Sequence, residues 1–290
     1  MDLKEVFVVG SGTMGSGIAQ VCAQRGINVT LCDISQDMLN KAVKSIGWSV
    51  SKFIEKGKVS EKLEDVMDRI KTSTGYEPAA GADLVIEAVF EKLEIKHDVF
   101  KSLDRIVKAT TILASNTSAI PISQIASVVS RPDRFLGLHF FNPVPMLDAV
   151  EVVRGIETSE AAIQYGIEFV KYLGKEPITV NRDIAGFILN RINMLSNLEA
   201  MRLVEQGVAT PADIDKGMRL AFGRKMGPLE TSDLVGLEVQ LMAYTNVYEE
   251  EKDLRFYPPS ILRRKVLAGH LGRKTGKGWY EYNKDGSVKK

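Results

Sequence analysis

The sequence predicts an α/β domain built on a parallel sheet, followed by an all-α domain. Short apolar runs alternate with helical patterns along the first part of the chain, which is typical of parallel strands covered by helices. After a last strand-like run at residues 176–180, the apolar spacing becomes helical and stays so. The expected domains are therefore residues 1–183 and 184–290.

Composition narrows the class of protein. The 290 residues suit one large or two medium domains, and an apolar content of 44% is enough for a real core. The net charge of +1 gives no sign of a nucleic-acid partner. Cys22 and Cys32 have neither metal-ligand spacing nor a disulfide pattern, so reduced thiols and no metal site are expected. No apolar run approaches the ~20 residues of a membrane span, and the first strand begins too early for a signal segment, so we expect a cytoplasmic protein.

The first strand, residues 6–9, leads directly into a glycine-rich turn, a helix and a second strand that ends in an acid. The turn reads Gly10-Ser11-Gly12-Thr13-Met14-Gly15, and Asp33 follows 18 residues after the last glycine. In this order the elements form the Rossmann dinucleotide-binding fingerprint. The alternative is a glycine turn in an unrelated α/β protein.

Each glycine of this turn has an expected purpose. Gly10 permits the tight turn, Gly12 lets a pyrophosphate approach the backbone, and Gly15 lets helix and strand pack closely. Thr13 and Met14 begin the helix whose N-terminus faces the phosphates. Asp33 can accept hydrogen bonds from both ribose hydroxyls and would repel a 2′-phosphate, so the sequence favours NAD over NADP.

A helical hairpin is expected between the second strand and the next one. Residues 36 to about 72 show helical spacing, interrupted at Gly57, and Ser60 is expected to begin the second helix. Lys52 and Lys56 lie on this arm. They form either a phosphate-binding surface or an ordinary solvated face.

Polar side chains follow the ends of the next strands. Residues 82–89 run into Glu91, a helix spans about 92–108, and residues 111–115 end in Asn116-Thr117-Ser118. In open α/β sheets, ligands bind beyond the carboxyl ends of the strands. Ser118 is therefore a candidate site residue, although a loop serine is commonly a turn or cap residue.

One of only three histidines, His139, stands near the end of an apolar run that leads to Asn142-Pro143. Glu151 lies in the next strand-like run, residues 149–153. A short turn between the two strands can bring imidazole and carboxylate together as a general base with an orienting partner. The alternative is a buried histidine and an edge glutamate without a catalytic role.

The second domain is expected to contain helices at about 184–206, from Thr210-Pro211 onward, at 230–250 and at 259–269. Their large apolar content suggests burial against a second subunit, with a self-contained core as the alternative. Asn190 lies inside the first helix of this prediction, where an asparagine is unfavourable unless its amide has a partner. That partner could be substrate.

These segments together resemble the L-3-hydroxyacyl-CoA dehydrogenase family, most closely the short bacterial 3-hydroxybutyryl-CoA dehydrogenases. The matching stretches, in chain order, are Gly10–Gly15 with Asp33, Glu91 with Lys96, 115–118, 139–143, Glu151, 186–191 and 276–280. They extend over almost the whole chain. One departure from the family pattern is Ala119, where the family has a second serine.

The resemblance implies an enzyme that interconverts (S)-3-hydroxybutyryl-CoA and acetoacetyl-CoA with NAD(H), in fatty acid or butanoate metabolism. It implies that His139 is the catalytic base with Glu151 as its partner, and that Ser118 and Asn190 contact the substrate oxygen. The residues implied on the cofactor side are Glu91, Lys96, Asn116, Ser118 and Asn142. Contacts to CoA map onto the arm near Ser49, Lys52 and Lys56, and a homodimer is expected.

Two other functions stay open on the sequence. One is an NAD-dependent dehydrogenase of a free hydroxy acid or sugar acid on the same fold. The other is a nucleotide-binding sensor or structural protein, which has no reason to keep Ser118, His139, Glu151 and Asn190 together.

Overall fold

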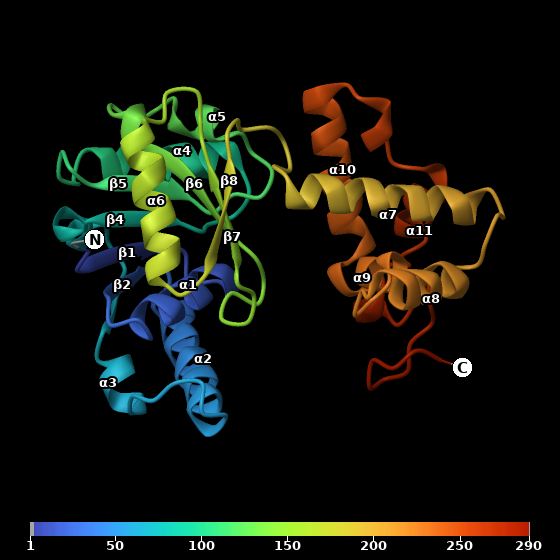
Figure 1. Ribbon diagram of the computed structural model, residues 1–290, viewed down its shortest axis with the longest axis horizontal. Helices are drawn as coiled ribbons and strands as arrows, with labels where there is room; N and C mark the ends of the chain where they lie inside the picture. Colours follow the sequence, from blue (N-terminus) through green and yellow to red (C-terminus); the bar gives the residue numbers. More distant parts are fainter. Residues whose placement is uncertain (1–2, 290) are drawn as a thin grey trace. The chain divides into compact units, whose positions relative to one another are not determined.

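The chain folds into two compact units that meet in sequence between Ile184 and Ala185. The computed structural model describes residues 3–289. The first unit contains the sheet, and the second is built from helices with a few short β-bridges. This confirms the predicted order of an α/β domain followed by a helical domain (Figure 1).

The sheet of the first unit has eight strands in the order β3-β2-β1-β4-β5-β6-β7-β8. The strands are β1 Glu5–Val9, β2 Asn28–Cys32, β3 Ile70–Ser73, β4 Leu84–Glu87, β5 Ile112–Ser115, β6 Phe135–Phe140, β7 Ala149–Val153 and β8 Glu176–Val180. The strands from β3 to β6 are parallel, β7 is antiparallel to β6, and β8 is parallel to β7. The direction reverses at β7 because only a short segment joins it to β6, and a parallel neighbour would need a longer crossover.

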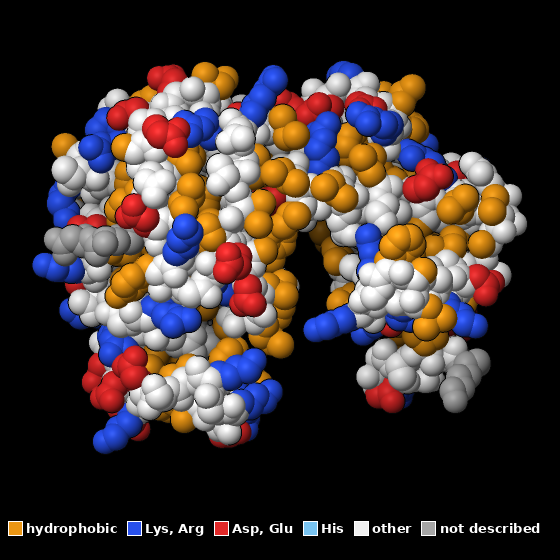
Figure 2. All heavy atoms as spheres, in the orientation of Figure 1, with side chains coloured by type: hydrophobic (Ala, Val, Ile, Leu, Met, Phe, Trp, Pro, Cys, Tyr) orange, Lys and Arg blue, Asp and Glu red, His pale blue; other side chains and the backbone are white. Residues whose placement is uncertain are grey.

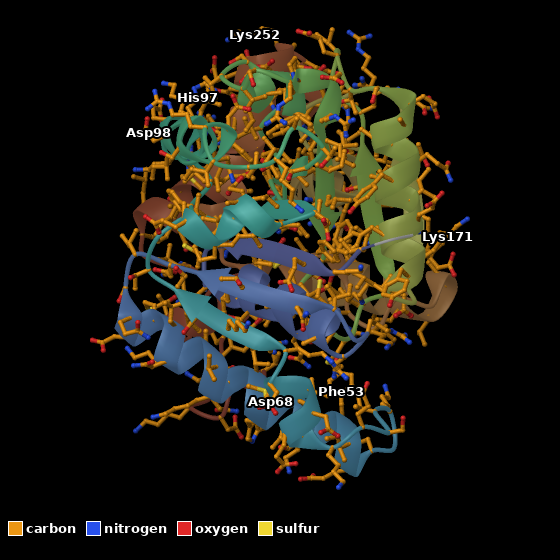
Figure 3. The ribbon with its side chains drawn as sticks, turned by 90° about the vertical axis from the view of Figure 1, so that its left-hand side faces the viewer. Phe53, Asp68, His97, Asp98, Lys171 and Lys252 are labelled. Carbon is orange, nitrogen blue, oxygen red and sulfur yellow. The ribbon has the colours of Figure 1, made fainter. Side chains whose placement is uncertain are left out.

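Helices cover both faces of the sheet. They are α1 Thr13–Ala23, α2 Gln36–Glu55, α3 Leu63–Met67, α4 Leu93–Asp104, α5 Ile122–Ala126 and α6 Glu160–Tyr172, with short 3₁₀ turns at Glu77–Gly81 and Pro132–Arg134. Figure 3 shows α4, labelled at His97 and Asp98, on one side of the sheet and α6, labelled at Lys171, on the other. The central strands are buried on both faces, as their continuous apolar runs predict.

The helical arm consists of α2 and α3. Ser35 caps α2 by accepting a hydrogen bond from the Met38 amide at 3.3 Å, and the helix buries one apolar stripe. Figure 3 labels Phe53 on α2 and Asp68, which follows α3 and leads into β3, on the arm below the sheet.

The predicted helix through residue 72 is wrong. The second helix of the arm begins at Leu63 rather than at Ser60 and ends at Met67. Residues 70–73 form β3, which pairs with β2 at the register Val29↔Ile70. Pairing with β3 gives hydrogen-bond partners to the backbone N–H and C=O groups of β2, which a longer helix would leave unpaired. The helical spacing of the sequence does not show this.

The second unit contains α7 Leu189–Glu205, α8 Pro211–Phe222, α9 Pro228–Val235, α10 Leu237–Glu251 and α11 Ser260–Leu267, with 3₁₀ turns at Leu254–Phe256 and Arg273–Thr275. The predicted start of α8 is confirmed, because the Thr210 hydroxyl accepts a hydrogen bond from the Asp213 amide. The predicted helix at 230–250 is instead two helices, since Gly236 adopts a positive φ of 104° between them.

The start of α7 also differs from the prediction. Gly186 and Phe187 have positive φ angles of 78° and 45°, so the helix begins at Leu189 and not at Ile184. Asn190 therefore lies in the first turn, not inside the helix. The argument that an interior asparagine needs a special partner does not apply to this position.

Candidate active site

The carboxyl ends of β1, β4, β5 and β6 lie along one edge of the sheet, because these strands are parallel neighbours in register. The segments that follow them carry the glycine turn, Glu91, the 116–119 loop and Asn142. Most of the predicted site residues of the first unit therefore share this edge.

His139 and Glu151 are directly opposite each other on β6 and β7. Because opposite residues of an antiparallel pair point to the same face, their side chains meet. His139 Nδ1 lies 2.6 Å from Glu151 Oε2, and only 4% of His139 and 0% of Glu151 is exposed. The Phe141 ring lies against the imidazole, with the ring centroids 4.4 Å apart. When Nδ1–H donates to the carboxylate, Nε2 becomes the nitrogen that exchanges a proton.

Glu91 holds the loop that carries Ser118. Its Oε1 accepts hydrogen bonds from Thr117 Oγ1 at 2.5 Å, the Ser118 amide at 2.9 Å and the Ala119 amide at 3.1 Å. Burial acts to raise the pKa of Glu91, but the Lys96 ammonium and the donors from Thr117 and Ser118 outweigh it and lower the pKa. Glu91 is therefore a carboxylate at neutral pH, and it fixes the backbone on both sides of Ser118.

Asn116 connects this loop to the strand that carries the histidine. Its Oδ1 accepts a hydrogen bond from the Phe140 amide at 2.9 Å, immediately after His139. The backbone N–H of Asn116 donates to the backbone oxygen of Glu87 at 2.8 Å. Asn142 follows two residues after Phe140 and precedes a cis peptide bond to Pro143. The loop and the end of β6 are thus held together by backbone and side-chain contacts.

Glu87 is a buried carboxylate that our interpretation of the sequence missed. It has 0% exposure at the end of β4, and Lys96 beside it has 1%. Lys96 Nζ lies 2.7 Å from Glu87 Oε1 and 3.1 Å from Glu91 Oε2. The signal in the sequence was an acid within the apolar run 84–89, where a buried charge needs a partner. Lys96 belongs to this buried group, and its contact with a cofactor stays a prediction.

The glycine turn leaves space at the N-terminus of α1. A Cβ on Gly10 would lie 2.5 Å from the Ala88 oxygen, and one on Gly15 would lie 1.8 Å from the Gly10 oxygen. A Cβ on Gly12 would meet nothing within 4 Å, and Gly12 caps α1 without a side-chain hydrogen bond. Thr13 and Met14 begin the helix, so their amides lie at an uncapped helix N-terminus. This arrangement fits a pyrophosphate.

Asp33 stands beside this turn at the end of β2. Its Oδ2 accepts hydrogen bonds from the Ser11 amide at 2.8 Å and the Ser11 hydroxyl at 2.7 Å, and its Oδ1 accepts one from the Ser35 amide at 3.1 Å. The carboxylate therefore orders the glycine turn, and its oxygens keep further acceptor capacity for ribose hydroxyls.

The predicted CoA contacts lie apart from this edge, on the arm. Ser49 is half-buried on α2, Lys56 is exposed at its end, and Lys52 pairs with Glu55 at 2.7 Å. Figure 2 shows basic side chains gathered over the lower end of α2 and acidic ones over α3. Asn190, the remaining predicted contact, belongs to the second unit.

Among residues 3–289, no group of three or more His, Cys, Asp or Glu side chains is arranged to hold a metal ion. Over the same residues, no helix has both the length and the apolar character that crossing a bilayer requires.

Comparison with known proteins places both units in one family. A family model for the NAD-binding domain of 3-hydroxyacyl-CoA dehydrogenase matches residues 5–184, and a model for the C-terminal domain of the same enzymes matches residues 186–282. The chain is 44% identical over 275 residues to a probable 3-hydroxybutyryl-CoA dehydrogenase of Deinococcus radiodurans, covering 95% of this chain and 99% of the relative. It is 41% identical to the 3-hydroxybutyryl-CoA dehydrogenase of Clostridioides difficile, covering 96% and 99%.

Solved structures agree with the sequence relatives. The crystal structure of (S)-3-hydroxybutyryl-CoA dehydrogenase from Ralstonia eutropha matches with a TM-score of 0.94 at 42% identity, covering 98% of this chain and 100% of that one. Both units and their motifs thus confirm the resemblance: the chain belongs to the 3-hydroxyacyl-CoA dehydrogenase family, and its first unit is the NAD-binding domain of that family.

Proposed function

We propose that the protein interconverts (S)-3-hydroxybutyryl-CoA and acetoacetyl-CoA with NAD(H), within fatty acid or butanoate metabolism. Two relatives and a solved structure that match the chain over almost their whole length are named 3-hydroxybutyryl-CoA dehydrogenases, one of them as a probable one. The observation that supports it in this chain is the buried His139–Glu151 pair, with 2.6 Å between Nδ1 and Oε2.

The first unit has groups suited to holding the cofactor. The space at Gly12 and the N-terminus of α1 fits the pyrophosphate, and Asp33 fits a ribose with two free hydroxyls. Glu91, Asn116 and Asn142 are proposed on the nicotinamide side, with Lys96 behind Glu91. When bound, NADH supplies the hydride that reduces C3 of the substrate.

His139 is proposed to move the proton. In the reducing direction His139 Nε2 donates a proton to the 3-keto oxygen, and in the oxidising direction it removes the proton of the 3-hydroxyl. Glu151 accepts the Nδ1 hydrogen bond throughout, so it fixes the tautomer and stabilises the imidazolium. Ser118 and Asn190 are proposed as contacts of the substrate oxygen, a role that rests on the family resemblance.

The arm is proposed to bind the nucleotide end of CoA through Ser49, Lys52 and Lys56. Lys56 is exposed and is the first residue after α2, where its ammonium can reach a phosphate. A pantetheine-length analogue of acetoacetyl-CoA lacks the nucleotide end. Lys56→Ala should then raise the KM for acetoacetyl-CoA and leave the KM for this analogue unchanged. Equal changes for both substrates would remove Lys56 from this role.

We also propose that the protein is a cytoplasmic homodimer, formed through the second unit. Large apolar side chains of that unit are exposed: Leu220 and Phe222 at the end of α8, Leu234 at the end of α9 and Met242 on α10. Exposed apolar side chains that gather into one patch mark interfaces, and these four are proposed to belong to such a patch. Sedimentation of the purified chain at micromolar concentration tests the dimer, which a single monomeric species would contradict.

The activity itself is tested by following NADH oxidation with acetoacetyl-CoA, beside NAD reduction with a free sugar acid such as gulonate. We expect turnover of acetoacetyl-CoA and none of the free acid. Turnover of the free acid alone would favour the dehydrogenase of a hydroxy or sugar acid, and binding of NADH without turnover of either would favour a nucleotide-binding sensor. NADPH in place of NADH should work poorly, and Asp33→Ala should reduce that preference.

A further inference from the structure

We propose that Glu87 is a positioning residue for this reaction: its buried carboxylate holds Lys96 and Ser115, and through them the loop that carries Ser118. The inference rests on the proposed function and assigns a role to a residue that does not itself face the substrate.

Glu87 receives three hydrogen bonds at the end of β4. Oε1 accepts from the Val89 amide and from Lys96 Nζ, both at 2.7 Å, and Oε2 accepts from Ser115 Oγ at 2.6 Å. Glu87 and Ser115 are also paired across β4 and β5. Glu87 therefore contacts the last residue of β5, immediately before the 116–119 loop, through its side chain, and its strand pairs with that residue.

Lys96 extends this frame to the loop itself. Its ammonium contacts Glu87 at 2.7 Å and Glu91 at 3.1 Å, and Glu91 in turn accepts from the amides of Ser118 and Ala119. The chain of contacts thus runs from Glu87 through Lys96 and Glu91 to the backbone of Ser118. A second route runs through Ser115 to Asn116, which binds the amide next to His139.

The charges of this group are not what stability alone would select. Two carboxylates share one ammonium, and Glu87 and Lys96 are 0% and 1% exposed. Ions removed from water in this way are often no more stabilising than well-packed apolar side chains of similar size. What the group does provide is a set of short, directional contacts that define where the loop lies.

Glutamine at position 87 tests this directly. It keeps the size of the side chain and leaves Lys96 paired with Glu91, so the chain should still fold, with a thermal unfolding midpoint lowered by the lost hydrogen bonding. The glutamine amide nitrogen cannot accept a hydrogen bond. If it takes the place of Oε2, Ser115 loses its acceptor, and if it takes the place of Oε1, Lys96 and Val89 lose theirs. A displaced loop misplaces Ser118, and we expect Glu87→Gln to lower kcat roughly 10- to 100-fold with little change in the KM for NADH.

Three comparisons separate positioning from a structural role. Asp83→Asn is the matched control, because Asp83, like Glu87, accepts hydrogen bonds from backbone amide and lysine donors, but it lies before the start of β4, at the opposite end of the strand. It should leave kcat unchanged. Lys96→Met should destabilise strongly by leaving Glu87 without its cation, and Glu87→Gln/Lys96→Met should recover stability without recovering kcat.

The proposal and the proposed function fail in different ways. No turnover by the wild-type chain would remove the function. Turnover by Glu87→Gln equal to wild type, or recovery of kcat in the double variant, would overturn the role of Glu87 and leave the function standing. Hydrogen exchange tests the same role without any substrate: the Ser118 and Ala119 amides should exchange faster in Glu87→Gln, and unchanged exchange would also overturn the proposal.

Discussion

Replacing Glu151 by Gln removes the charge that faces the catalytic imidazole while keeping an oxygen that can accept from Nδ1–H. The contact is short, 2.6 Å, and both groups are buried, so solvent screens it weakly. A hydrogen bond that involves a charged group contributes about 1.5–3 kcal/mol. Because this bond is stronger when the imidazole is charged, its loss should act mainly on the step that forms the imidazolium.

At about 1.4 kcal/mol per factor of ten, that range corresponds to a fall in kcat of roughly 10- to 150-fold. The assay is steady-state NADH oxidation with acetoacetyl-CoA over a range of pH. The KM for NADH should stay the same, and the pH dependence of kcat should change. Glu176 is an exposed carboxylate at the start of the neighbouring strand β8, so Glu176→Gln is the control. A Glu151→Gln enzyme with the kcat and pH profile of wild type would show that this carboxylate only packs beside the imidazole.

The remaining predictions concern the cofactor turn and the loop. Gly15→Ala should lower the free energy of unfolding by about 1–3 kcal/mol or more, because its Cβ would lie 1.8 Å from the Gly10 oxygen. Gly12→Ala should lower it by less than about 1 kcal/mol but weaken NADH binding in a fluorescence titration; equal effects of the two variants would contradict this. The lowered pKa of Glu91 means that its carboxylate stabilises the fold above the ordinary value of 4.5, and that this contribution is lost as pH falls through the lower folded value. Glu91→Gln should therefore flatten the loss of unfolding free energy below pH 4.5 in urea titrations, and a loss as steep as in wild type would refute the argument.

Much of the first unit could be predicted because its signals are local. A buried strand, three glycines, a helix and a strand ending in an acid follow one another between Glu5 and Asp33, and each element constrains the next. The pair His139 and Glu151 could be anticipated as well, because a short connection forces β7 to run antiparallel beside β6. Which residues face each other still depended on the register, and the structure supplied it.

Other features depend on contacts between distant segments and have no local signal. Residues 70–73 have helical spacing, yet they pair with β2 because that edge of the sheet is open. Besides the nearby Val89 amide, the burial of Glu87 depends on β5, which places Ser115 beside it, and on α4, which places Lys96 at the same point. A sequence shows that such an acid lies in an apolar run, but not which partners make its burial possible.

Backbone conformation accounts for the remaining differences in the second unit. Gly236 divides one expected helix into two, and Phe187 takes a positive φ that residues other than glycine seldom adopt. The positive φ of Phe187 shortens α7 and moves Asn190 into its first turn. Side-chain periodicity carries no information on either point, since the apolar spacing continues across both positions.

The central claim is that His139 transfers the proton while the bound cofactor exchanges hydride with C3. Single-turnover mixing of the NADH complex with acetoacetyl-CoA measures that step directly in wild type and in His139→Gln. We expect unchanged NADH binding and a rate of NADH oxidation at least about 10²-fold lower in the variant. A His139→Gln enzyme that oxidises NADH at the wild-type rate would contradict it.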